Sequence, residues 1–200
     1  MVNIAVLVSG SGSNLQALID NCLNHNIDGE IKVVISNRQK AYGLQRAKDA
    51  GIKALWIKDQ KELLAKIKEE KIELIVLAGY LAIIDDELIK EYDGRIINIH
   101  PSLIPSFCGK GYYGIHVHEA AFKRGVKVSG ATVHFVSNVV DGGPIIIQEA
   151  IDVSDCDTPE AMQMKVLKIE HQILPKAVKL FCENRLEIKD ERVIIKWGEH

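Results

Sequence analysis

The sequence has little net charge and few cysteines, and each shortage excludes a class of protein. Its 200 residues include 25 basic and 27 acidic side chains, for a formal charge of −2. A nearly neutral chain lacks the positive field that captures nucleic acid or an anionic membrane, so we expect neither as a partner. The four cysteines, Cys22, Cys108, Cys156 and Cys182, form no C-x-x-C pair, which favours reduced thiols and a cytoplasmic protein.

Long apolar runs are also missing. The longest, from Leu74 to Ile84, is too short to cross a bilayer. The apolar stretch from Val2 to Val8 lacks the length and the basic flank of a signal peptide, so we expect no secretory leader. The length and the 47% hydrophobic composition suit one globular domain over residues 1–200.

What the sequence does contain is an alternation of short β-branched runs with amphipathic segments. Strands are predicted at 3–9, 31–37, 53–57, 73–80 and 95–100, and helices at 14–26, 44–50, 59–70 and 85–92. Continuously apolar strands favour a parallel sheet that is covered on both faces. We therefore expect an α/β fold with a single doubly wound, mostly parallel sheet.

The second half of the chain has a different pattern. Residues 101–114 are rich in Pro, Gly and Ser and predict a loop, and a short helix is expected at 117–123. Two apolar runs at 129–137 and 143–153 predict an antiparallel strand pair in the C-terminal half. The remaining elements are a long helix at 158–184, with Pro159 in its first turn, and a hairpin at 185–198 that turns at 189–191.

A glycine turn, residues 9–14, follows the first predicted strand. Ligands of open α/β sheets bind beyond the carboxyl ends of the strands, glycines let the backbone approach closely, and free amides at a helix start attract anions. We therefore predict that Gly12, Ser13 and Asn14 bind a small phosphate group. The alternative is an ordinary helix cap made by Ser13 or Asn14.

Two better-known nucleotide loops do not fit this turn. The dinucleotide fingerprint requires a third glycine where the chain has Leu15, and an acidic residue where it has Ser36, Asn37 and Arg38. The G-K-[ST] sequence of nucleoside triphosphate loops is absent.

A polar cluster is predicted at the end of the strand at 95–100. Asn98 and His100 are two residues apart, so their side chains point to the same face. An amide donor beside a titratable imidazole can stabilise an oxyanion and transfer a proton. Asp141, in a glycine-rich loop, would fix the tautomer of His100 and raise its pKa if it reaches the ring. The alternative is a structural Asn and His before Pro101, with Asp141 as a turn residue.

Other reactive side chains carry weaker signals. His116, His118 and His134 could suggest a metal, but their spacing matches no known motif, and we expect no metal. Cys108 has no evident base or orienting partner, so we do not expect it to be a nucleophile.

Five segments in this order, GSGSN, NIHPSLIPSF, SGATVHFV, DGGPIIIQ and IEHQILP, resemble the phosphoribosylglycinamide formyltransferase family of purine biosynthesis. The resemblance implies a Rossmann-like formyltransferase fold. It also implies transfer of a formyl group from 10-formyltetrahydrofolate to the amine of glycinamide ribonucleotide, giving the N-formyl product and tetrahydrofolate. The expected partners are these two small molecules, and the expected state is a monomer or a homodimer.

The resemblance also implies roles for residues at matching positions. The catalytic set is Asn98, His100 and Asp141. The ribonucleotide would be bound by Gly12, Ser13, Asn14 and Glu170. The folate would be bound by Lys61, Leu81, Ala82, Ile83, Ile84, Asn98 and Val140.

The chain departs from the family on the folate side. Ala82 stands where members often have an arginine, so Lys61 is the expected cation for the anionic folate tail, and the loop at 108–116 is longer than in many members. Three alternatives remain. They are a formyltetrahydrofolate hydrolase with the same Asn, His and Asp, an NAD-dependent oxidoreductase, and a phosphate-binding domain without catalysis. Related formyltetrahydrofolate and methionyl-tRNA enzymes share the catalytic set but carry an additional domain.

Overall fold

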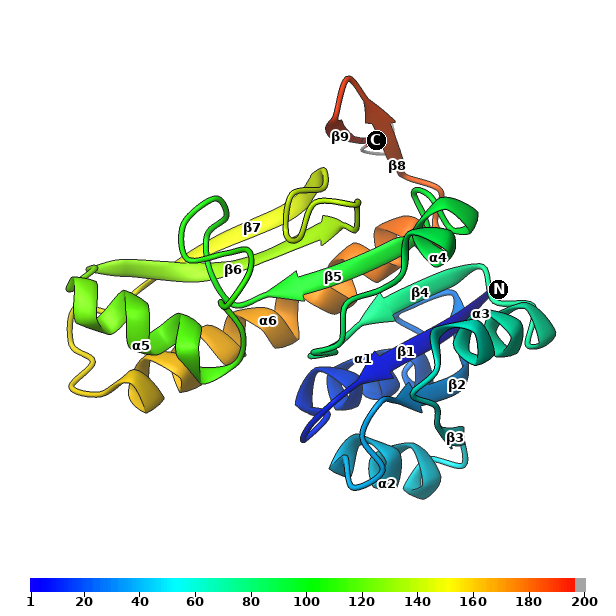
Figure 1. Ribbon diagram of the computed structural model, residues 1–200. Coiled ribbons are helices and arrows are strands. Elements are labelled where there is room, and N and C mark those ends of the chain that lie inside the picture. The colour runs from blue at the N-terminus through cyan, green and yellow to red at the C-terminus, as the bar shows by residue number, and fades with distance from the viewer. Residues whose placement is uncertain (197–200) are drawn as a thin grey trace.

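One seven-stranded sheet organises the computed structural model, which describes residues 1–196 (Figure 1). The strands are β1 (Val2–Val8), β2 (Gly29–Ser36), β3 (Lys53–Trp56), β4 (Leu74–Leu77), β5 (Ile96–His100), β6 (Val128–Phe135) and β7 (Ile145–Asp152). The helices are α1 (Ser13–Leu23), α2 (Tyr42–Asp49), α3 (Gln60–Glu69), α4 (Asp86–Glu91), α5 (Ile115–Arg124) and α6 (Pro159–Cys182).

The strand order is β3-β2-β1-β4-β5-β6-β7. The chain first builds outward from β1 to β3 and then returns to add β4 on the other side of β1, so the order reverses between β1 and β4. All pairs from β3 to β5 are parallel, whereas β5–β6 and β6–β7 are antiparallel. The predicted doubly wound, mostly parallel sheet with a C-terminal antiparallel pair is confirmed.

Both faces of the sheet are covered because the central strands are apolar on both faces. Along β1, Ile4, Val6 and Val8 pack with α1, α2 and α6, whereas Ala5 and Leu7 pack with α3 and α4. All five side chains are at most 1% exposed. This alternation is the period of two that an extended strand imposes on its side chains.

Local signals in the sequence set the helix boundaries. Asp59 caps α3 by accepting a hydrogen bond from the amide of Glu62 at 2.9 Å, and Thr158 caps α6 through the amide of Ala161 at 3.1 Å. Pro159 occupies the first turn of α6, as predicted. Within residues 1–196, no helix is long and apolar enough to cross a membrane.

One predicted strand is shorter in the structure, and the predicted C-terminal hairpin is present. The strand predicted at 73–80 ends at Leu77, because Gly79, with a φ of 73°, turns the chain away from the sheet. The predicted C-terminal hairpin is present as β8 (Leu186–Lys189) and β9 (Arg192–Ile195), which form a separate two-stranded sheet (Figure 1). Its predicted end, Trp197 and Gly198, lies outside the described residues.

Candidate functional site

The carboxyl ends of β1, β4 and β5 open into a cavity of about 770 Å³. Parallel strands end at the same edge of a sheet, so the loops that follow them meet there. Of the predicted site residues, those that line the cavity are Gly12, Ser13, Asn14, Leu81, Ala82, Ile83, Ile84, Asn98, His100, Val140, Asp141 and Glu170. Lys61 does not line it and lies exposed in the first turn of α3.

The antiparallel register of β5 and β6 gives Asn98 a partner that the sequence reading missed. Asn98 lies directly opposite His134, and its Nδ2 is 3.1 Å from Nε2 of that ring. The Nδ1 of His134 donates to the Phe135 carbonyl at 2.8 Å, so in the neutral ring Nε2 accepts from the amide. His134, 2% exposed, therefore fixes the orientation of the Asn98 side chain.

Asp141 lies between two imidazoles. One carboxylate oxygen is 3.6 Å from Nδ1 of His100, and the other is 3.7 Å from Nε2 of His134. The amide of Gly109 donates to the first oxygen at 2.8 Å. Burial raises the pKa of the Asp141 carboxyl, but His134, His100 and the Gly109 amide together outweigh burial and hold this pKa below its ordinary value. Asp141 is therefore ionised near neutral pH.

The loop that carries Asp141 is pressed against the end of β6. Asp141 has a φ of 55°, a conformation that aspartate tolerates better than most residues. A Cβ on Gly143 would lie 1.8 Å from the Phe135 carbonyl oxygen, so only glycine fits there. This close approach explains the glycine at position 143, and Asp141 in the same loop lies next to His134.

The pKa of His100 is shifted in the opposite direction from the prediction. It is 4% exposed, and burial lowers its pKa below the ordinary value, although the carboxylate of Asp141 acts in the opposite direction. The prediction that Asp141 raises the pKa was right about that contribution and wrong about the net shift. Nε2 donates to the Phe107 carbonyl at 2.9 Å, so the neutral ring presents an unprotonated Nδ1 towards Asp141.

The glycine turn makes the start of α1, and no side chain caps that helix. The predicted alternative of a cap by Ser13 or Asn14 is therefore wrong. Gly12 has a φ of 72°, and a Cβ there would lie 2.7 Å from the Gly43 backbone in α2. Gly12 is thus needed for packing against α2, whereas the first amides of α1 lack intrahelical acceptors.

Asn14 and Glu170 meet at this end of the cavity, although 156 positions separate them. Asn14 Nδ2 donates to Glu170 Oε2 at 2.7 Å, and Asn14 Oδ1 is buried without a partner. Burial raises the pKa of the Glu170 carboxyl, and the hydrogen bond from Asn14 opposes that shift. The pair joins α1 to α6 and leaves polar atoms available to a ligand.

Apolar side chains line the other end of the cavity. The segment 81–84 is anchored by the amide of Leu81, which donates to Ser9 Oγ at 2.8 Å. Ile83 is 76% exposed and Val140 51% exposed, so this wall presents apolar surface to solvent. Such surface is suited to a flat aromatic ligand.

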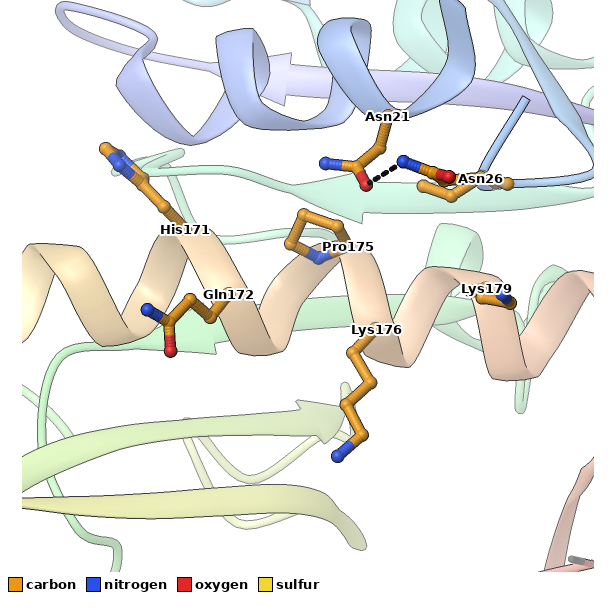
Figure 2. A pocket seen from close by; sticks show the side chains of 8 residues that line it. Asn21, Asn26, His171, Gln172, Pro175, Lys176 and Lys179 are labelled. Atoms are coloured by element: carbon orange, nitrogen blue, oxygen red, sulfur yellow. Dashed lines mark hydrogen bonds between the residues drawn. The ribbon is translucent and has the colours of Figure 1, made fainter. Parts of the chain in front are cut away.

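A second cavity of about 440 Å³ lies between α1 and α6 (Figure 2). His171 and Pro175 face α1 there, whereas Lys176 points away from it. Its lining contains none of the predicted site residues. Within residues 1–196, no group of three or more His, Cys, Asp or Glu side chains is arranged to hold a metal ion.

Known proteins of one family are similar to this chain over most of its length. The formyl transferase family model matches residues 2–178. Phosphoribosylglycinamide formyltransferase of Escherichia coli is 37% identical over 94% of this chain and 91% of its own length. The structure of glycinamide ribonucleotide transformylase 1 from Symbiobacterium toebii superposes with a TM-score of 0.92 and 42% identity, covering 98% of this chain and 94% of that one.

A formyltetrahydrofolate deformylase from Pseudomonas syringae is also similar, with a TM-score of 0.87 and 28% identity. The match covers 97% of this chain but 65% of the deformylase chain. The match therefore covers a larger share of each of the two formyltransferase chains than of the deformylase chain.

Proposed function

The chain belongs to the formyl transferase family and transfers a formyl group to phosphoribosylglycinamide, and we propose that Asn98, His100 and Asp141 perform this reaction with 10-formyltetrahydrofolate as donor. The observation that carries the assignment is their convergence. All three line one cavity, with Asp141 3.6 Å from His100 and Asn98 anchored to the histidine on the other side of Asp141.

The reaction requires an oxyanion donor and a route for one proton. The acceptor amine attacks the formyl carbon, the new C–N bond forms, and negative charge develops on the formyl oxygen. Asn98 uses one N–H on His134 and has a second N–H for this oxygen. Removing such a donor typically costs about 100-fold or more in rate.

His100 is suited to move the proton. Its lowered pKa keeps the ring neutral, so Nδ1 can accept a proton from the attacking amine. The ionised Asp141 then stabilises the imidazolium. When the bond between the formyl carbon and folate N10 breaks, the proton passes to N10, and tetrahydrofolate and the N-formyl product leave. Every proton and bond is thus accounted for without a covalent enzyme intermediate.

The two ends of the cavity suit the two substrates. The first amides of α1, at Ser13 and Asn14, provide donors for the ribonucleotide phosphate, and Glu170 offers acceptor oxygens for its hydroxyl groups. The apolar wall at 81–84, with Val140, suits the pterin ring, to which the backbone of this segment can also donate and accept hydrogen bonds. Both substrates would then be bound by one domain.

Substitution of the catalytic set tests this proposal. Asn98→Ala, His100→Ala and Asp141→Asn should each lower kcat/KM for formyl transfer by at least about 100-fold. In a triple variant, the loss of activity should be smaller than the sum of the three single losses in free energy, because the residues act as one unit. Normal turnover in a folded variant would remove that residue from the mechanism. Cys108→Ser, a change in the neighbouring loop, serves as a control and should retain activity.

A further inference from the structure

Two cationic side chains outside the histidines, Arg38 and Lys110, line the active-site cavity within the described part of the chain. We propose that Arg38 binds the phosphate of the acceptor and makes the enzyme selective for a phosphorylated acceptor. This inference rests on the proposed function, because it names a further residue of the same site.

The position of Arg38 follows from the sheet. In the parallel pair of β1 and β2, Val8 lies opposite Ser36, so the loop after β2 runs beside the glycine turn after β1. Ser9 Oγ donates to Asn37 Oδ1 at 2.6 Å, which ties the two loops together. Arg38 is the next residue, and it lines the same cavity as Gly10 to Asn14.

The backbone of Arg38 is fixed while its side chain is left available. The hydroxyl of the fully buried Ser36 accepts from the Arg38 amide and donates to the Arg38 carbonyl, both at 3.0 Å. The amide of Ala41 donates to the same carbonyl at 3.1 Å. The residue is exposed, and its guanidinium has no ion pair or hydrogen bond with any of residues 1–196.

Arg46, the other arginine near the glycine turn, is already engaged. Its Nε donates to the Ser11 carbonyl at 2.8 Å, its Nη1 donates to Gln16 at 3.1 Å, and its guanidinium lies over the Tyr42 ring. Arg46 therefore braces the turn. Arg38 is the nearby arginine whose donors remain available for a ligand.

The chemistry of the site calls for such a cation. Asp86, Asp141 and Glu170 also line the cavity, so a phosphate dianion would otherwise meet acidic side chains. A guanidinium binds two phosphate oxygens through parallel N–H donors, and the amides of α1 can bind the third. A charge-assisted contact of ordinary strength corresponds to roughly a 10- to 100-fold change in affinity.

The decisive comparison is Arg38→Gln against Lys40→Gln, which removes the same charge from an exposed residue two positions away that does not line the cavity. We expect Arg38→Gln to raise KM for glycinamide ribonucleotide about 10- to 100-fold. In Arg38→Gln, we expect kcat and the KM for folate to stay within about twofold of the parent. Arg38→Lys should have a ribonucleotide KM between those of the parent and Arg38→Gln, and Lys40→Gln should leave this KM unchanged. An unchanged ribonucleotide KM in folded Arg38→Gln overturns the inference.

Two further measurements separate this inference from the proposed function. With the riboside that lacks the phosphate, Arg38→Gln should have the same kcat/KM as the parent, and a parallel loss there would overturn a phosphate-specific role. Calorimetry with ribose 5-phosphate needs no catalysis and should show binding to the parent and weaker binding to Arg38→Gln. Equal binding to both would sink the inference even in an enzyme that transfers formyl groups. Absence of formyl transfer by the parent would instead refute the proposed function.

Discussion

The buried imidazole of His118 should make the fold sensitive to acid. This side chain in α5 is 1% exposed, and its Nδ1 is buried without a hydrogen-bond partner. Burial, with a smaller effect of His100, lowers its pKa from 6.5 to about 4. The unfolded chain therefore binds a proton that the folded chain excludes across this interval, so stability falls as the pH drops from about 6.5 to about 4.

The magnitude follows from the shift. Lowering the pKa of His118 from 6.5 to about 4, at about 1.36 kcal/mol per pH unit, corresponds to roughly 3 kcal/mol in the free energy of unfolding. His118→Leu removes the titrating group, and no hydrogen bond of Nδ1 is lost because that atom has no partner. At neutral pH, we expect the free energy of unfolding of the variant to lie within about 1.5 kcal/mol of that of the parent.

Urea unfolding of both proteins at about pH 7 and about pH 4 measures this effect. Other buried groups titrate in both proteins, so the difference between the two pH dependences isolates His118. Between these two pH values, the free energy of unfolding should fall by about 3 kcal/mol more in the parent than in His118→Leu. Equal losses would show that the imidazole is not held neutral by burial, and the reasoning would fail.

Three further predictions concern the site. His134→Ala should lower kcat/KM for formyl transfer about 10- to 100-fold, because Nε2 of His134 holds the amide of Asn98 in the orientation that the proposed mechanism requires. Activity near that of the parent would refute this role. Gly12→Val should lower the free energy of unfolding by about 1–3 kcal/mol, since its Cβ meets Gly43, and should raise KM for the ribonucleotide more than for folate, which urea unfolding and initial rates will show. Lys61→Ala should raise the KM for folate by up to about fivefold, and Ala82→Arg should tighten folate binding, most strongly at low salt. Folate affinity of both variants is measured at two ionic strengths. If neither variant differs from the parent at either one, the folate tail lies in solvent.

The parallel part of the fold was predictable because each of its elements carries a local signal. Buried strands such as β1 are continuously apolar, and the cap of α3 by Asp59 and the start of α6 at Pro159 follow from residue type. The early end of β4 at Leu77 was not predictable, because apolar residues continue past Leu77 and the strand is ended by the left-handed backbone of Gly79.

The convergence of part of the candidate site was also predictable, since Asn98 and His100 share a strand and their alternation alone places them on one face. His134 was missed as a partner because its role depends on the register between β5 and β6, which pairs residues 36 positions apart. The net pKa shift of His100 was mispredicted for a similar reason. The sign depends on how far the fold buries the ring, which no neighbouring residue in the sequence reveals.

The most direct test of the account follows both products when the protein is given 10-formyltetrahydrofolate with and without glycinamide ribonucleotide. We predict that tetrahydrofolate forms only when the ribonucleotide is present, that one N-formyl product appears per tetrahydrofolate, and that no formate is released. Asn98→Ala should slow this coupled formation at least about 100-fold under the same conditions. Formate release at the same rate without the ribonucleotide would contradict the account and identify water as the acceptor.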